Sequence, residues 1–278
     1  MKFFNYICLL LLAAVSSCST TSEETAPLNE TENLFLIQTL ENDHHFLELY
    51  SESGELKEGY NKILLRLQDK IDKEYIPNAE VEWIPVMDMG TIKHSAPNSE
   101  VVKAPGKNTS YEGYIIFQMA GGDSGTWSLQ INYTVDGENF SMEDRLQVLA
   151  SPRKKVTVFK GKDEVNYVLA IIEPRQPKVA TNDISAALYK MENMHKFSIV
   201  DNYRILIDPR MPAMGHGSPN NVHLTQGNKG VYHGKLNLTM SGYWKINLQL
   251  EDETGEIIIG EAITDTNQDS NIFFELEF

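Results

Sequence analysis

The chain has 278 residues and a formal net charge of −15, and its length fits two domains of about 120 residues each. So acidic a balance argues against nucleic acid as a partner, because a polyanion attracts basic surfaces, and it disfavours close contact with anionic lipid headgroups. Domains of this size bury an adequate hydrophobic core without disulfide or metal staples.

The N-terminus has the features of a bacterial lipoprotein signal. Lys2 precedes an apolar run over residues 7–15, and Val15-Ser-Ser-Cys18 has the pattern of a lipobox. The run is too short for a membrane-spanning helix. We therefore predict a signal peptide over residues 1–17 and a mature protein that begins at lipidated Cys18, anchored to the bacterial cell envelope at the outer membrane or cell surface. The alternative is an ordinary signal peptide that happens to contain Cys18.

This processing excludes cysteine chemistry from the mature domains. Of the two cysteines, Cys8 leaves with the signal peptide and Cys18 carries the lipid. We therefore expect no disulfides, cysteine-based zinc sites or thiol catalysis. A chain without free thiols also suits an oxidising compartment outside the cytoplasm.

The composition of residues 18–33 predicts an acidic, flexible tether. No Lys or Arg occurs between residues 19 and 56, and the beginning of this segment is too polar to fold alone. Acidic residues directly after a lipidated cysteine, here Glu23 and Glu24, resemble the surface-export signals of some bacterial lipoproteins. A plain spacer is an equal alternative.

From about residue 34 the pattern is that of β-structure. Short β-prone runs separated by Gly, Asn, Asp and Pro lie at residues 46–50, 62–67, 81–83 and 115–117. Antiparallel strands with one solvated face are indicated by apolar and polar residues that alternate over 127–133, 236–240, 244–251 and 272–278. Residues 183–194 are the best helical candidate.

We therefore predict an all-β fold with two tandem immunoglobulin-like antiparallel β-sandwich domains. The first covers residues 34–150 and the second covers residues 156–278. The boundary falls in the short, basic, proline-bearing stretch over residues 150–155. We expect a linker this short to leave the two domains end to end with some bending.

An internal duplication indicates that the two domains are copies of one another. The first copy contains Met87-Asp-Met89-Gly-Thr-Ile-Lys-His94, and the second contains Met211-Pro-Ala-Met214-Gly-His216. In both copies a proline stands two residues before the first Met. Each copy continues with a Tyr and a Met eight residues apart, and then with Gly-Thr-Trp or Gly-Tyr-Trp. The duplication therefore places Met and His at the same corner of each domain.

The Met/His turn of the second copy is the stronger candidate metal site. Thioether sulfur is soft and prefers Cu(I), and imidazole accepts Cu(I) and Cu(II). Met211, Met214 and His216 lie within six residues, and His223 is a candidate fourth ligand from the next segment. The alternative is a turn that only plugs one end of the sandwich.

The corresponding turn of the first copy offers Met87, Met89 and His94 as copper ligands. His94 comes five residues after Met89, and Lys93 beside it would oppose a cation. We therefore expect the first turn to bind copper less tightly than the second. The same alternative of a structural plug applies here.

The remaining Met, Trp and His residues receive structural roles. Their strand phase predicts core packing for Met119, Met240, Trp127 and Trp244. Adjacent residues on a strand point to opposite faces, so a pair of neighbouring histidines does not readily bind one metal. Surface positions are expected for His44, His45, His195 and His233.

Catalysis has little support in the sequence. It contains no Gly-x-Ser-x-Gly elbow, no His-Glu-x-x-His, no phosphate-binding glycine loop and no dinucleotide fingerprint. The carboxylates are scattered over polar faces and form no obvious acid/base pair. We expect a protein that is not an enzyme.

The segment from Met211 to Gly217, with the strand after Tyr232, Met240 and Gly-Tyr-Trp244, resembles the YtkA-like domain family. The resemblance covers residues 202–251 well and residues 80–135 more weakly. It implies small extracytoplasmic β-sandwiches that are often attached to membranes and associated with copper handling or cytochrome oxidase assembly.

The resemblance also implies that Met211, Met214 and His216 face the metal, with Met87, Met89 and His94 as their counterparts. We therefore expect a lipid-anchored envelope protein that binds copper and buffers it or delivers it to a receiving protein, an oxidase being one candidate. The alternative is a structural or adhesive surface lipoprotein without metal, whose loops and strand edges contact partners.

Overall fold

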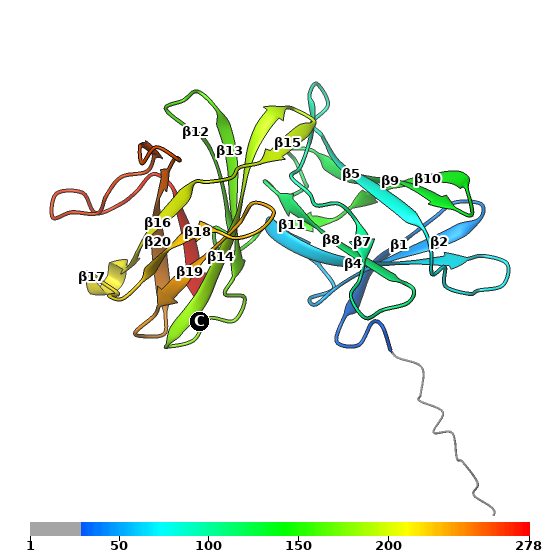
Figure 1. Ribbon diagram of the computed structural model, residues 1–278, viewed down its shortest axis with the longest axis horizontal. Coiled ribbons are helices and arrows are strands. Elements are labelled where there is room, and N and C mark those ends of the chain that lie inside the picture. The colour runs from blue at the N-terminus through cyan, green and yellow to red at the C-terminus, as the bar shows by residue number, and fades with distance from the viewer. Residues whose placement is uncertain (1–28) are drawn as a thin grey trace, which may run out of the picture.

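The computed structural model describes residues 29–278, so the predicted signal peptide, Cys18 and most of the predicted tether lie outside the described residues. Apart from one short 3-10 helix, all regular structure in this part of the chain is β-strand, which confirms the all-β prediction. Two β-sandwiches lie side by side (Figure 1). Within residues 29–278, no helix has the length and apolar character needed to cross a membrane.

The first sandwich consists of two antiparallel sheets around one hydrophobic core. The five-stranded sheet has the order β1 (Phe35–Glu41), β2 (His45–Ser51), β4 (Gly59–Asp69), β8 (Ser110–Phe117), β7 (Val102–Lys103). The facing sheet has the order β10 (Glu138–Leu146), β9 (Thr126–Val135), β5 (Glu80–Asp88), β6 (Lys93–Ser95). A short parallel pair completes this half of the chain: β11 (Val148–Leu149) with β3 (Leu56–Lys57).

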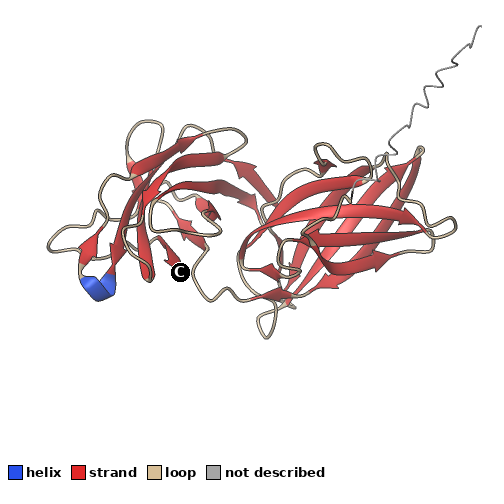
Figure 2. Ribbon diagram, turned by 90° about the horizontal axis from the view of Figure 1, so that it is seen from below, coloured by secondary structure: helices blue, strands red, loops and turns tan. Residues whose placement is uncertain are grey.

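The second sandwich is one hydrogen-bonded sheet that folds over its own core (Figure 2). Its main path is β12 (Val156–Lys160), β13 (Asn166–Glu173), β14 (Thr181–Asn193), β19 (Val231–Asn237), β18 (Val222–Gln226), β16 (Arg204–Met211), β20 (Tyr243–Glu251), β21 (Ile257–Ile259). Three shorter strands pair beside it: β15 (Lys196–Ile199) with β14, β17 (His216–Gly217) with β16, and β22 (Phe273–Glu277) with β20. The two halves of this sheet meet at β18, whose pairing with β19 is irregular.

The alternating residues face the cores as predicted. In β20 the apolar members of the alternation are buried in the second core, and Trp244 is its largest side chain. In β9 the equivalent residues are buried in the first core around Trp127. The predicted packing role of both tryptophans is therefore confirmed.

The predicted helix over residues 183–194 is wrong, because residues 183–193 belong to strand β14. Ile184, Ala186 and Leu188 face the second core. Ala187 and Tyr189 point the other way, into a separate apolar cluster. A strand buried on both faces lacks polar alternation, so its alanines and leucine were mistaken for a helical pattern.

That separate cluster is the contact between the two sandwiches. The outer faces of β4 and β8 pack against the outer faces of β13 and β14, with Ile116, Val168 and Tyr189 among the buried residues. An ion pair joins Arg175 to Glu52 at 2.8 Å across the same contact. The contact therefore joins one end of β4 and β8 to the outer faces of β13 and β14, and the two sandwiches follow one another along the long axis of the molecule (Figure 2).

The last residues of the predicted tether are part of the folded first domain. The side chain of Glu30 is 7% exposed and accepts hydrogen bonds from the Ser110 hydroxyl at 2.6 Å and the Asn108 amide at 2.8 Å. Burial alone would raise the pKa of Glu30, but hydrogen bonds from Ser110, Asn108 and Thr109 outweigh it and lower the pKa to about 2. The hydrogen bonds of Glu30 thus hold the segment before β1 against the start of β8.

Candidate functional site

In the first domain, the Met/His turn forms one end of a row across three strands. His94 on β6 lies opposite Met87 on β5, and Met87 lies opposite Trp127 on β9. Residues directly opposite each other in antiparallel strands project to the same face of the sheet. Met87 and Trp127 are fully buried, and the half-buried His94 ring meets the Trp127 ring edge-on with centroids 5.5 Å apart.

The second domain repeats this row. His216 on β17 lies opposite Met211 on β16. The register Arg210 opposite Lys245 brings Met211 beside Trp244 on β20. The half-buried His216 ring is edge-on to Trp244, with centroids 6.4 Å apart. The duplicated Met and His residues are therefore cross-strand partners in both domains.

A second methionine lies exposed on each turn. Met214 ends the 3-10 helix η1 (Pro212–Met214) and is 57% exposed. Gly215 then takes a left-handed conformation at φ 67°, and its amide donates to the Met211 carbonyl at 3.0 Å, which returns the chain to β17. In the first domain Met89 has the corresponding place and is 42% exposed.

The first methionine of each turn belongs to a hydrophobic core. Met211 is 6% exposed and belongs to the second core, and Met87 is fully buried in the first. Gly242 explains part of this packing, because a Cβ at its φ of 120° would lie 3.1 Å from the Met211 methyl group. The repeated Gly before each Trp is thus a packing requirement of the turn.

The geometry removes both reasons for ranking the first turn below the second. The hairpin returns His94 to a position opposite Met87 despite the longer turn between them. Lys93 is paired with Asp88 at 2.8 Å, and this hydrogen bond and ion pair lower the pKa of Asp88 and raise that of Lys93. The Lys93 charge is therefore offset beside the turn.

The His94 ring is held in a state suited to metal binding. Its Nδ1 lies 2.8 Å from the Ser95 carbonyl oxygen, and a carbonyl only accepts, so Nδ1 carries the proton. In the neutral ring with this tautomer, Nε2 has the lone pair that binds a metal. Metal-binding histidines commonly have this second hydrogen bond to a carbonyl.

His223 is not placed to complete the second turn. Its Nδ1 accepts a hydrogen bond from the Ile207 amide at 3.1 Å, so the neutral ring carries its proton on Nε2. Ile207 is four residues before Met211 on β16, about 13 Å away along a strand. Burial and the nearby Arg204 lower the pKa of His223, which keeps it neutral. The prediction of His223 as a fourth ligand is therefore wrong.

Two further methionines lie beside the rows, and the sequence analysis assigned them to the core. The Trp127 indole donates to the Met119 carbonyl at 3.0 Å, and the Trp244 indole donates to the Met240 carbonyl at 2.9 Å. Met119 is half-buried against the first core, but Met240 is exposed, so its predicted core role is wrong. The equal spacing from Tyr to Met in both copies was the signal for this position.

The other histidines divide between surface and core. His44, His195 and His233 are exposed as predicted. His45 is buried, contrary to prediction, with its Nδ1 2.8 Å from the Tyr133 hydroxyl. Burial lowers the pKa of His45, so it is a neutral, structural histidine.

Harder ligand sets are not assembled in this part of the chain. Among residues 29–278, no group of three or more His, Cys, Asp or Glu side chains is arranged to hold a metal ion.

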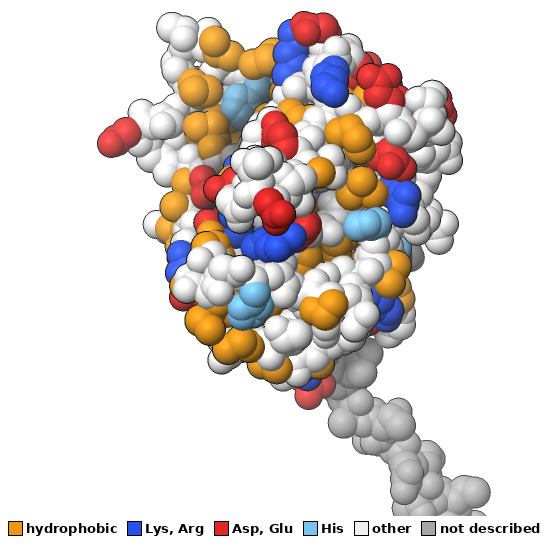
Figure 3. Space-filling model, turned by 90° about the vertical axis from the view of Figure 1, so that its left-hand side faces the viewer, with side chains coloured by type: hydrophobic (Ala, Val, Ile, Leu, Met, Phe, Trp, Pro, Cys, Tyr) orange, Lys and Arg blue, Asp and Glu red, His pale blue; other side chains and the backbone are white. Residues whose placement is uncertain are grey.

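On the face of the molecule that carries β17, histidine side chains lie near exposed hydrophobic side chains (Figure 3).

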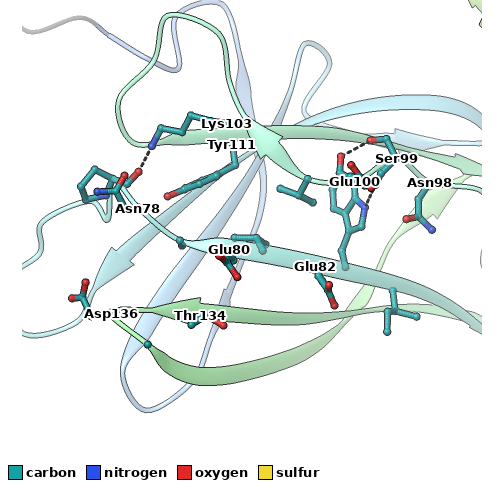
Figure 4. A pocket seen from close by; sticks show the side chains of 17 residues that line it. Asn78, Glu80, Glu82, Asn98, Ser99, Glu100, Lys103, Tyr111, Thr134 and Asp136 are labelled. Carbon is teal, nitrogen blue, oxygen red and sulfur yellow. Dashed lines mark hydrogen bonds between the residues drawn. The ribbon is translucent and has the colours of Figure 1, made fainter. Parts of the chain in front are cut away.

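A cleft of about 920 Å³ lies on the open side of the first sandwich, and none of the candidate ligands lines it (Figure 4). Its rim is acidic, with Glu80 and Glu82 on β5 and Glu100 opposite them. Lys103 donates to the Pro77 carbonyl within it. Over residues 80–85, β5 pairs with β9 on one side, and no described strand pairs with it on the cleft side.

Comparison with known protein families finds a match in the second half of the chain. A model of the YtkA-like family matches residues 161–249, in the second half of the chain, which confirms the resemblance predicted there. The matched residues include Met211, Met214 and His216. No curated protein matches the sequence.

One solved structure is also similar: a chimeric titin Z1Z2-Z1Z2 tandem (Z1212) functionalized with a GRGDS exogenous peptide from fibronectin. The two chains are 10% identical with a TM-score of 0.19, and the similarity covers 80% of this chain and 93% of that chain.

Proposed function

We propose that this chain, with its YtkA-like second half, is a cell-envelope lipoprotein that binds Cu(I) at its Met/His turns and buffers or delivers copper. The observation that carries the proposal is the repeated row His–Met–Trp, with an exposed methionine on the turn in both domains. A packing role alone does not require a half-buried imidazole and an exposed thioether at the same place twice.

The ligand chemistry favours Cu(I) over harder cations. Thioether sulfur and imidazole are soft to borderline ligands, and neither carries the negative charge that Mg²⁺ or Ca²⁺ needs. Methionine does not titrate, so such a site keeps its sulfur ligands over a wide pH range. Met214 and His216 are the accessible ligands of the second turn, and Met211 supports them from the core.

The cellular role follows from the predicted processing. Lipidated Cys18 would hold the mature protein at a membrane, with the residues before Glu30 as a spacer. Copper bound on exposed turns is accessible to a receiving protein, for which an oxidase is one candidate. The protein would have no catalytic role of its own.

The decisive test is a competition titration of the full-length protein in detergent against a Cu(I) chelator, with zinc as the competing metal. Met214→Leu combined with His216→Asn should abolish the binding event of the second turn and leave the thermal unfolding midpoint nearly unchanged. His233→Asn, which removes an exposed imidazole on β19, is the matched control and should not affect binding. Copper affinity that is identical in all three proteins would overturn the proposal.

A second candidate is a structural or adhesive lipoprotein, which the cleft of the first domain favours. The unpaired edge of β5 offers backbone hydrogen bonds to an extended segment, and Glu80 and Glu82 would attract basic side chains on it. In that case the buried Met87 and Met211 only plug the ends of their sandwiches. Binding of basic peptides without any copper binding would favour this candidate.

A further inference from the structure

The hairpin between β14 and β15 crosses from the second domain to the Met/His turn of the first. The Ser95 amide on β6 donates a hydrogen bond to the Met194 carbonyl at 2.7 Å. Met194 and His195 are the two residues at the tip of this hairpin, because Asn193 pairs directly with Lys196. In Figure 1 the hairpin tip meets the loop after β5.

The tip is held by its backbone and leaves its side chains free. The His195 amide donates to the Asn193 side chain at 2.9 Å, which fixes the turn. Phe197, on the returning strand, packs into the apolar cluster between the domains. The Met194 side chain is nevertheless 41% exposed, and the His195 side chain is exposed as well. A soft thioether and an imidazole are thus presented at a defined place.

That place lies beside β6, the strand that carries His94. Ser95, the residue that holds the hairpin tip, directly follows His94 in β6, and its carbonyl fixes the His94 ring through Nδ1. Ser95 itself is buried and donates through its hydroxyl to the Pro85 carbonyl at 2.8 Å. The hydrogen bond between Ser95 and the hairpin tip therefore rests on well-packed backbone.

Met89 does not take part on this side. A Cβ on Gly125 would lie 3.1 Å from the Met89 Cγ, so the Met89 side chain leans toward β9. The hairpin tip lies beyond β6, on the opposite side of β5. The hairpin tip is the part of the second domain that brings Met and His side chains beside β6.

We propose that His94, Met194 and His195 form one Cu(I) site shared between the two domains. This inference rests on the proposed copper function and names the ligands of its first site. Two imidazoles and one thioether match the ligand preference of Cu(I). Of the nearby cations, Lys93 is paired with Asp88. The pKa of Glu192 is lowered by hydrogen bonds from Ser198 and Lys190 and, to a smaller extent, by the charge of Lys196.

Copper binding at a shared site would depend on how the two domains are arranged. The backbone hydrogen bond between Ser95 and Met194 holds the two halves of the site beside each other. Copper bound by residues of both domains would then oppose their separation. The candidate ligands of the second turn, in contrast, all lie within residues 211–216 of one domain.

The test uses the full-length protein with Met214→Leu and His216→Asn, so that only the first site remains. In this background, Met194→Leu with His195→Asn should weaken Cu(I) binding roughly tenfold or more, since loss of even indirect support for a metal ligand has that effect. X-ray absorption at the copper edge should show the loss of sulfur from the metal. His44→Asn, an exposed imidazole in the first domain, is the matched control.

The outcomes separate the two proposals. If His94→Asn weakens binding but the Met194/His195 variant retains full affinity and its sulfur signal, the shared site is overturned and the copper function stands. If the unsubstituted chain binds no Cu(I), both are overturned. Thermal melts of every variant show whether a loss of affinity reflects a loss of fold, and an affinity loss with an unchanged midpoint supports the shared site.

Discussion

The hydroxyl groups of Tyr114 and Tyr189 lie 2.6 Å apart and share a hydrogen bond that joins the two sandwiches. Tyr114 projects from the outer face of β8 and Tyr189 from the outer face of β14, within the apolar cluster between the domains. Burial raises the pKa of both phenols, so both stay protonated at neutral pH. Each buried hydroxyl thus has a partner, and the contact is a packed interface.

The second domain alone should fold but lose stability. Residues 151–278 contain every member of the second core, so the fragment should be all-β and unfold cooperatively. Its outer face, including Val168 and Tyr189, would be exposed, which should lower the melting temperature and promote self-association. Far-UV circular dichroism, thermal melts and sedimentation test this. A disordered fragment would show that the two copies fold only together.

The two methionines of the second turn should differ sharply in their effect on stability. Met211→Ala removes a buried core side chain and should cost about 2–5 kcal/mol. Met214→Ala removes an exposed side chain and should cost less than about 0.5 kcal/mol. Urea denaturation of both variants measures the difference. Equal losses would contradict the assignment of Met211 to the core and Met214 to the surface.

Glu30 should contribute to the stability of the folded state at neutral pH. Its pKa is about 2 in the folded protein, against an ordinary value of 4.5, so the folded state binds fewer protons between these values. The contribution is complete above about pH 4.5 and is lost as the pH falls toward 2. Glu30→Gln should therefore lower the free energy of unfolding at pH 7 and flatten its decline below pH 4.5.

The control for this prediction is Glu32→Gln, a substitution at an exposed carboxylate two residues away. It should leave both the neutral stability and the acid dependence nearly unchanged. An acid dependence that is the same in Glu30→Gln and in the unsubstituted protein would show that the Ser110 contact does not stabilise the carboxylate.

Cys18→Ala should release the protein from membranes or leave it unprocessed. A lipid chain supplies about 0.8 kcal/mol per buried methylene, and an acidic chain is not attracted to anionic headgroups. Fractionation with a high-salt wash checks the outcome. A variant that is processed and still sediments with membranes would show that the attachment does not depend on Cys18.

Much of the fold could be predicted from residue alternation, and the exceptions share one cause. Strands with one solvated face, such as β9 and β20, alternate clearly in the sequence. Strand β14 faces its own core on one side and the first domain on the other, so its pattern carries no polar phase. The sequence of a single strand therefore does not show that its outer face packs against another domain.

The candidate site shows the same limit. The duplicated Met and His residues predicted which turns correspond, and the strand register places them opposite one another. Sequence spacing did not reveal that Met211 points into the core or that the His223 ring accepts a hydrogen bond from the Ile207 amide. Nor could it bring Met194 to Ser95, because a contact between residues about one hundred positions apart depends on how the domains pack.

Two neighbouring alanines on β14 pack against different parts of the molecule. Ala186 and Ala187 are both fully buried, but Ala186 lies in the core of the second domain and Ala187 lies between the domains. A larger residue at position 186 would strain the interior of one sandwich, whereas the same residue at position 187 would act as a wedge that pushes the sandwiches apart. Substitutions at these two neighbouring positions can therefore alter the packing inside the second domain and the arrangement of the two domains separately.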